Sequence, residues 1–228
     1  VTVSSNAVAA VSRVAKKVAT KRDQLADEKR EALGLVDDLL KQPPLRRWML
    51  VRNSSRYRTF AVVDALLTAS QQQVFNSPQD GIETAQLAKA LQEAIDPATY
   101  GSGPLADLGA RVYGCLAHAQ RAASRLTESE ASLERAQTLL EEGTGDPLEE
   151  AQVLYFKALL LLAQRHFALA LRTVDRALSR YRRFGSHIKV ARALVGKAAI
   201  QGRTGDFEKA IREDLTRILG PGGFDADK

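Results

Sequence analysis

Hydrophobic residues recur along this chain at spacings of three and four, with small residues at fixed places among them. Leu126, Phe167 and Phe207 each begin such a stretch, and the small residues Ser129, Ala170 and Ala210 follow three positions later. The register thus repeats after 41 residues and again after 40 residues. No strand-like alternation is present in the sequence. The pattern predicts an all-α stack of helical pairs, in which each pair covers the apolar face of the next.

Helix-breaking residues divide the chain into elements. A long helix is predicted over 6–42, ending at Pro43-Pro44, followed by a short helix over 44–51 and a helix that begins at the turn 53–55. A further helix begins at Ser77-Pro78, and a loop is predicted over 96–104. Three helical pairs are then predicted over 105–125 with 127–142, 148–164 with 166–183, and 188–202 with 206–219. This gives a long N-terminal helix (1–42), a degenerate repeat region (43–104), three hairpins (105–219) and a disordered tail (220–228).

The residues at the repeat positions match a known motif. In the pair over 148–183, large, small and aromatic residues stand where the motif has them: Leu154, Ala158, Leu161, Phe167, Ala170, Val174 and Ala177. The chain here resembles the tetratricopeptide repeats, in particular the variety of about 40 residues found in bacterial regulators and scaffolds. The match covers 105–219 well and 56–96 weakly. The resemblance implies a right-handed superhelical array of antiparallel helical hairpins, an α-solenoid similar to tetratricopeptide domains.

In this family the first helix of each hairpin lines a concave surface. By resemblance, that surface would present Arg111, His118, Arg121, Gln152, Tyr155, Leu159, Leu162, Arg192, Val195 and Arg203. Arginine binds carboxylates through paired hydrogen bonds and tyrosine adds rigid contact area, so the surface suits an acidic peptide with an apolar anchor. An alternative assigns Leu159 and Leu162 to the core and the arginines to solvent. The asparagine with which some members hold a C-terminal carboxylate is replaced by Cys115, Phe156 and Gly196, which argues against that clamp.

The formal net charge is +6, and the charges come in blocks. Residues 41–58 contain no acid and include a candidate basic patch of Arg46, Arg47, Arg52, Arg56 and Arg58, while 128–150 is acidic and 172–192 is basic. Such alternation favours helices that pair their polar faces, or one positive surface strip. The aromatic residues Trp48 and Tyr57 among the arginines are compatible with nucleic-acid binding, but their spacing is also that of a core-facing stripe.

The sequence offers no catalytic signature. His118, His166 and His187 lack a histidine partner at helical spacing, and no phosphate-binding or nucleophile motif is present, so no enzyme activity, metal or cofactor is predicted. No apolar run is long enough to span a membrane. The single cysteine, Cys115, is predicted to be a small buried residue in a reducing, cytoplasmic environment.

These observations predict a non-enzymatic scaffold or adaptor that binds a peptide or protein on its concave face, as the sensory or assembly part of a bacterial cytoplasmic regulator. The alternative is a nucleic-acid-associated subunit that uses its basic helical patches. An enzyme would need a catalytic domain outside this sequence. The long N-terminal helix is a candidate for self-association.

Overall fold

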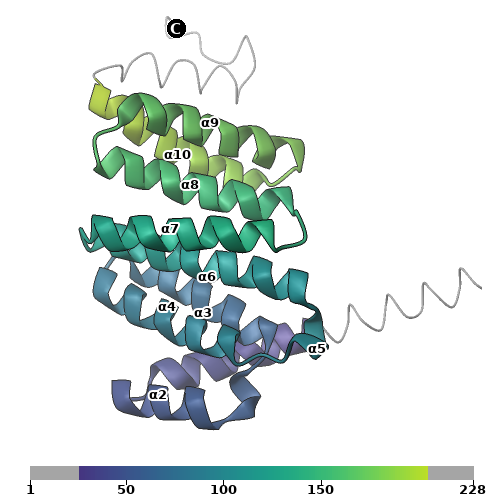
Figure 1. Cartoon of the computed structure of the whole chain (residues 1–228). Helices are drawn as coiled ribbons and strands as arrows, with labels where there is room; N and C mark the ends of the chain where they lie inside the picture. The colour runs from purple at the N-terminus through teal and green to yellow at the C-terminus, as the bar shows by residue number, and fades with distance from the viewer. Residues whose placement is uncertain (1–25, 205–228) are drawn as a thin grey trace, which may run out of the picture.

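The computed structural model describes residues 26–204, and every regular element within that range is helical. The helices lie roughly side by side in a stack, with α2 at one end and α9 and α10 at the other (Figure 1). The all-α prediction is confirmed for the described residues. The first part of the predicted N-terminal helix, the helix predicted over 206–219 and the tail lie outside them, and with them much of the segment proposed for self-association.

Residues 26–40 form the first helix, and the other elements follow in order. They are α2 (Pro44–Asn53), the 3-10 turn η1 (Ser55–Tyr57), α3 (Phe60–Gln73), α4 (Pro78–Glu93), α5 (Pro97–Tyr100), α6 (Ser102–Ala122), α7 (Leu126–Glu141), α8 (Pro147–Ala163), α9 (Phe167–Arg183) and α10 (His187–Thr204).

The helices pack as successive hairpins. Helices α3 and α4, α6 and α7, and α8 and α9 pair with each other, and the leading helix of each hairpin also contacts the leading helix of the next, α3 with α6, α6 with α8, and α8 with α10. The second helix of each hairpin contacts the leading helix that follows, α4 with α6, α7 with α8, and α9 with α10. This contact order is compatible with an α-solenoid.

Small residues allow the paired helices to approach closely, as the sequence predicted. The Ser129 hydroxyl of α7 donates a hydrogen bond to the carbonyl oxygen of Ala117 on α6 (2.8 Å). The Ser70 hydroxyl of α3 makes the same kind of bond to the carbonyl of Gly81 on α4 (2.7 Å). Between α8 and α9 the fully buried Ala170 takes this place. A larger residue at any of these positions would push two backbones apart.

Three helices end in the same type of turn. Ser124, Arg165 and Gly185 have positive φ angles of 62°, 64° and 68° after α6, α8 and α9. In each turn the next amide donates to a carbonyl five residues back, from Arg125 to Gln120, from His166 to Leu161 and from Ser186 to Tyr181. These bonds satisfy carbonyls that the helix itself leaves unpaired, and they reverse the chain within a few residues.

Two predicted boundaries are wrong. The helix α3 begins after Thr59, whose side chain accepts a hydrogen bond from the Val62 amide, whereas the predicted start at 53–55 forms the end of α2 and η1. The predicted loop 96–104 contains the short helix α5, because Asp96 caps it and Pro97 stands at its first position. Gly101, with φ of 87°, then turns the chain directly into α6, three residues before the predicted start.

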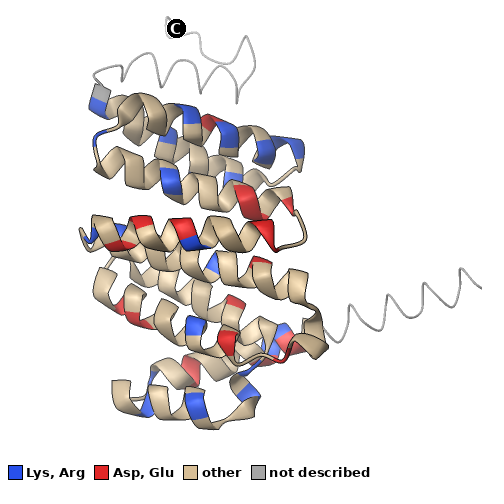
Figure 2. Ribbon diagram, in the orientation of Figure 1, with Lys and Arg blue, Asp and Glu red and all other residues tan. Residues whose placement is uncertain are grey.

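The charge blocks of the sequence partly neutralise each other across helices. Arg180 of α9 forms two hydrogen bonds to the Glu150 carboxylate of α8 (2.7 and 3.1 Å), and Lys197 of α10 pairs with Asp175 of α9 (3.1 Å). Figure 2 shows basic residues along α9 and acidic residues at one end of the neighbouring α8. The prediction that helices pair their polar faces is confirmed at these contacts.

Candidate functional site

A cleft of about 530 Å³ lies among the leading helices. Its walls come from α3 and the residues just after it, from α6, from α8 and from α10, and none of its lining residues comes from α4, α7 or α9. Of the ten residues expected on the concave surface, six polar or aromatic ones line this cleft: Arg111, His118, Arg121, Gln152, Tyr155 and Arg192. Leu159 and Val195 line it as well, whereas Arg203 and Leu162 do not.

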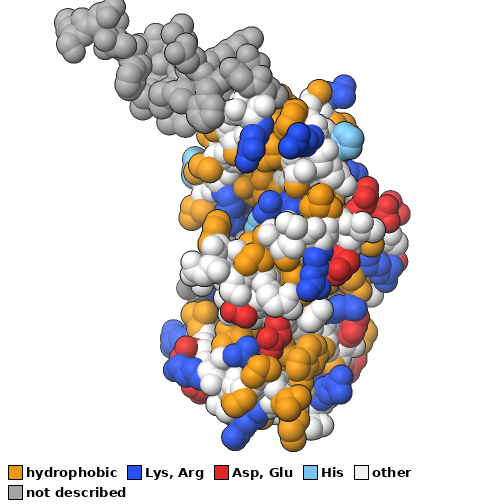
Figure 3. Space-filling model, turned by 90° about the vertical axis from the view of Figure 1, so that its left-hand side faces the viewer, with side chains coloured by type: hydrophobic (Ala, Val, Ile, Leu, Met, Phe, Trp, Pro, Cys, Tyr) orange, Lys and Arg blue, Asp and Glu red, His pale blue; other side chains and the backbone are white. Residues whose placement is uncertain are grey.

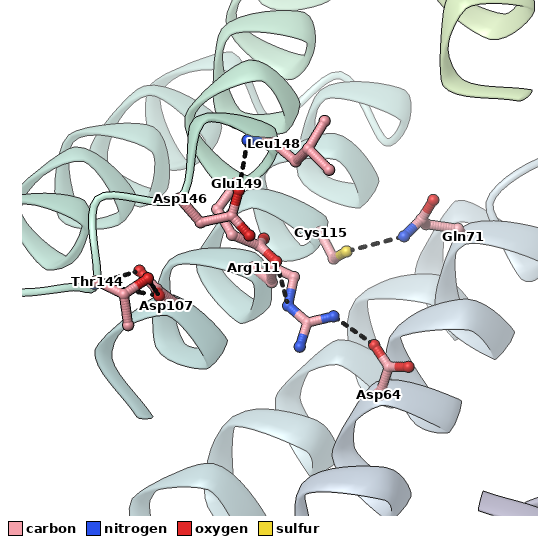
Figure 4. A network of polar contacts seen from close by, with 9 residues as sticks. All are labelled: Asp64, Gln71, Asp107, Arg111, Cys115, Thr144, Asp146, Leu148 and Glu149. Atoms are coloured by element: carbon pink, nitrogen blue, oxygen red, sulfur yellow. Dashed lines mark hydrogen bonds and ion pairs between the residues drawn. The ribbon is translucent and has the colours of Figure 1, made fainter. Parts of the chain in front are cut away.

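Arg111 was expected on the concave surface as a residue that contacts a partner, but its guanidinium is already paired with two carboxylates. Its guanidinium lies between Asp64 of α3, at 2.5 Å, and Glu149 of α8, at 3.4 Å (Figure 4). It also lies over the ring of Phe60. Burial raises the pKa of Glu149, and the positive charge of Arg111 works against that increase. Arg111 of α6 therefore connects α3 and α8 through ion pairs, and its charge is balanced by these two carboxylates at one end of the cleft.

The same end of the cleft is stabilised by a second polar cluster. The buried Asp107 accepts hydrogen bonds from the amide and the hydroxyl of Thr144 in the connector between α7 and α8 (Figure 4). Asp146 then caps α8 by accepting from the Leu148 amide (2.8 Å). These contacts hold the start of α8, and hence Glu149, in place beside Arg111.

Cys115 is buried between α6 and α3, as predicted. Gln71 donates a side-chain hydrogen bond to its sulfur (3.2 Å), and burial raises the pKa of the thiol to about 12. A thiol with this pKa is almost entirely protonated at neutral pH, so Cys115 is a packing residue and not a nucleophile.

The other end of the cleft contains groups without charged partners. The His118 ring stacks on Phe156 with a centroid distance of 4.9 Å, and its Nδ1 atom is sealed from solvent without a hydrogen-bond partner. Burial, followed by the charges of Arg121 and Arg192, lowers the pKa of His118 to about 3. The imidazole is therefore neutral at physiological pH.

Tyr155 connects α8 to α10 across this end. Its hydroxyl donates to the backbone carbonyl of Arg192 (3.3 Å), and burial raises its pKa. A Cβ atom on Gly196 would lie 2.9 Å from the Tyr155 ring, so glycine allows α10 to lie against the ring. Arg192 in turn donates to the Gln71 side chain of α3 (2.9 Å), which links α10 to α3 across the cleft.

Apolar side chains complete the cleft, and several of them were not predicted. Leu67 and Phe75 come from α3 and its end, opposite Leu159 and Val195. Phe75 is 85% exposed and Val195 is 72% exposed, which is unusual for large hydrophobic side chains that flank a hollow. The weak repeat over 56–96 gave no basis for placing α3 residues here.

The candidate basic patch is largely engaged within the fold. Arg47 donates to the carbonyls of Gln42 and Leu40 and pairs with Glu83, and Arg58 donates to the carbonyl of Arg52. Arg56 donates to the Tyr57 hydroxyl and lies over its ring. Arg52 stacks over Trp48, which is partly buried against the core, and Arg46 is exposed. Nucleic-acid binding through these arginines stays a prediction, with fewer free cations than the sequence suggests.

This end of the molecule is also apolar on its surface. Leu45 and Met49 of α2 are 82% and 62% exposed. In the side view of Figure 3, hydrophobic side chains gather at the lower end, at the level of α2, with few acidic ones among them. A phosphate-binding strip is typically rich in free cations, whereas this surface mixes arginines with exposed apolar side chains. Such a mixture is more typical of the end of a helical stack on which no further helix packs.

Residues 26–204 contain neither a candidate metal site nor a candidate membrane span. Within that range no group of three or more histidine, cysteine or acidic side chains is arranged to hold a metal ion. No helix of the same range is long and apolar enough to cross a membrane. The chain matches no protein-family model, no curated protein and no solved structure.

Proposed function

We propose that this chain is a non-enzymatic scaffold with the superhelical architecture of tetratricopeptide domains, and that it binds a peptide or an extended protein segment in the cleft of its leading helices. The observation that carries this proposal is the lining of the cleft. Residues from four helices, distributed over more than 120 positions of the chain from Asp64 to Ala199, converge on one hollow, and all these helices are leading helices.

The chemistry of the cleft suits a peptide. Exposed apolar groups such as Phe75 and Val195 offer anchoring contacts, and the half-buried Gln152 offers an amide that can pair with a peptide backbone. The lining contains three cations without an ion pair in the described part of the chain, Arg121, Lys189 and Arg192, and a fourth, Arg111, that is paired with Asp64 and Glu149. A segment with an apolar anchor and negative charge complements this surface.

A scaffold of this kind needs no catalytic group of its own. By the resemblance noted for 105–219, its partner would be a component of a bacterial regulatory or assembly system, and the chain would act as an adaptor or a sensory part. Binding in the cleft would bring the partner into contact with all three hairpins and α10 at once, so partner binding would also stabilise the stack.

The test is a selection of random dodecapeptides displayed on phage against the full chain, followed by fluorescence anisotropy with the synthesised peptides. In the variant Val195→Glu the cleft loses an exposed apolar contact and gains an acid that competes for its cations. The matched control is Ile188→Glu, because Ile188 is also on α10 and is 79% exposed but does not line the cleft.

We expect the selected peptides to bind wild type and Ile188→Glu alike and to bind Val195→Glu at least about ten-fold more weakly, the equivalent of one anchoring contact. Selected peptides that bind both variants equally, or a selection that enriches no peptide, would contradict binding in the cleft.

A further inference from the structure

The cations of this molecule differ in whether a carboxylate neutralises them. Arg111 has Asp64 and Glu149, Arg180 has Glu150, and Lys197 has Asp175. Arg121, which lines the cleft from the last turn of α6, has no ion pair in the described part of the chain. Its Nε atom is shielded from solvent and has no hydrogen-bond partner there.

Because Arg121 is partly buried, its charge is unfavourable without a counterion or a further hydrogen-bond acceptor. Burial lowers the pKa of its guanidinium, which shows that the charged form is poorly solvated. The negative end of the α6 dipole offsets part of the charge, but it supplies no acceptor for the Nε–H group. A cation held in a partly desolvated position without a counterion binds an incoming anion strongly, because much of its solvation has already been lost.

Two other groups face the same part of the cleft. His118 stands one helical turn before Arg121, and its neutral ring has a buried Nδ1 with no partner. Arg192 of α10 uses one Nη to hold Gln71, which leaves its remaining N–H groups for other acceptors. Both arginines influence the pKa of His118 and of Tyr155, so the four side chains lie close enough for their charges to interact.

We propose that Arg121, with Arg192 and His118 beside it, forms a carboxylate subsite that receives an acidic group of the bound peptide. The proposal deepens the proposed function and rests on it. The peptide carboxylate accepts hydrogen bonds from the Arg121 guanidinium of α6 and lies close to Arg192 of α10. The peptide residue next to this carboxylate packs on Leu159 and Val195. The Arg111 end of the cleft takes no anion, because two carboxylates already occupy it.

The carboxylate can come from an aspartate or glutamate side chain or from the C-terminus of the peptide. Synthetic peptides separate these sources. One series carries an amidated C-terminus, and a second replaces each acidic side chain by its amide. A side-chain carboxylate predicts that only the second change weakens binding, and a terminal carboxylate predicts the reverse.

The probe is a dodecapeptide obtained by phage display whose binding requires Val195, measured by fluorescence anisotropy on the full chain. We expect replacement of its carboxylate to weaken binding to wild type about 10-fold to 100-fold, the range for a hydrogen bond to a charged group. The same replacement should have little effect with Arg121→Gln, since the partner group is then absent. Arg172→Gln serves as the matched control, because Arg172 is exposed on α9 and does not line the cleft.

Arg192→Gln provides a second variant; Arg192 is exposed, and its replacement also removes the hydrogen bond to Gln71. An equal loss of affinity in wild type, Arg121→Gln and Arg192→Gln on removal of the carboxylate would overturn the subsite while leaving peptide binding in the cleft standing. Selected peptides without any carboxylate would do the same. A selection in which no peptide depends on Val195 would overturn the proposed function together with the subsite.

Discussion

The buried histidine of the cleft makes the stability of the protein depend on pH in a way that can be calculated. His118 is neutral in the folded chain because burial and the charges of Arg121 and Arg192 lower its pKa to about 3. In the unfolded chain its pKa returns to about 6.5. Between these two values the unfolded chain binds a proton that the folded chain does not, so acid favours unfolding.

The magnitude follows from the difference between the two pKa values. The contribution of the neutral His118 to the free energy of unfolding is fully present above the pKa that His118 has in the unfolded chain. Below that pKa it decreases by about 1.4 kcal/mol for each pH unit. At about pH 5 the free energy of unfolding should therefore be lower by about 2 kcal/mol than at neutral pH. The loss continues until the pH approaches the folded pKa of about 3.

Other groups titrate in the same range, so the comparison must isolate His118. Glu149 acts in the opposite direction, because burial raises its pKa and the folded chain then takes up a proton before the unfolded chain does. The variant His118→Gln removes the titrating imidazole and leaves Glu149 in place. His166→Gln is the matched control, since His166 is exposed at the start of α9.

The assay is urea denaturation followed by circular dichroism at several pH values between about 7.5 and 5, the window in which the linkage acts. We expect wild type and His166→Gln to lose about 2 kcal/mol more than His118→Gln over this window. Parallel losses in all three proteins would show that His118 is not held neutral in the cleft, and the description of its surroundings would be wrong.

Three further predictions concern the packing and the turns. Ala170→Leu should lower the free energy of unfolding by about 1–3 kcal/mol, because Ala170 is fully buried between α8 and α9. The control Ala168→Leu, on the exposed side of α9, should change it little, and equal melting temperatures of the two variants would reject the predicted helix contact. Arg165 has a positive φ angle, which glycine adopts without the steric cost of a Cβ atom. Arg165→Gly should therefore raise the free energy of unfolding by about 0.5–1 kcal/mol, whereas Arg165→Ala should not, and thermal melts of both variants test this. Gly143→Ala should destabilise the fold, since a Cβ atom there would clash with Asp107 Oδ1. Gly34→Ala, with nothing within 4 Å of the added atom, should instead raise the free energy of unfolding by about 0.5–1 kcal/mol, measured by urea denaturation.

Much of the fold could be predicted because its determinants are local. Apolar spacing and small residues such as Ser129 and Ala170 specify the helices and their close contacts, and both act within about one repeat. The first helices share one register, so eight residues of the cleft could be identified from the resemblance to the repeat motif. The start predicted at 53–55 is wrong because Thr59 is the residue that caps α3. The loop predicted over 96–104 from its proline and glycine residues is wrong because Asp96 and Pro97 begin a short helix there.

The contribution of α3 could not be predicted in the same way. Phe75 and Gln71 lie in the degenerate copy, where the motif gave no reliable register, and they meet residues of α6 and α10 only because the helices stack in three dimensions. The ion pairs of Arg111 have the same origin, since Asp64 is 47 residues away in sequence. A sequence pattern identifies the face on which a residue lies, but the pairing of two faces depends on how several repeats are superposed.

Arg111 and Arg121 show how such pairing makes the two ends of one cleft electrostatically different. Both arginines come from α6 and both line the hollow. An incoming carboxylate at Arg111 would have to displace Asp64 and Glu149, so the energy gained by the new ion pair would be offset by the loss of two existing ones. At Arg121 the same carboxylate would displace no acid and would supply an acceptor that the buried Nε–H lacks. We therefore expect a bound peptide to take one orientation, with its negative charge at the end of α6 and its neutral part towards Asp64. A peptide of reversed sequence should bind more weakly although its composition and charge are unchanged, and equal affinity of the two would contradict this asymmetry.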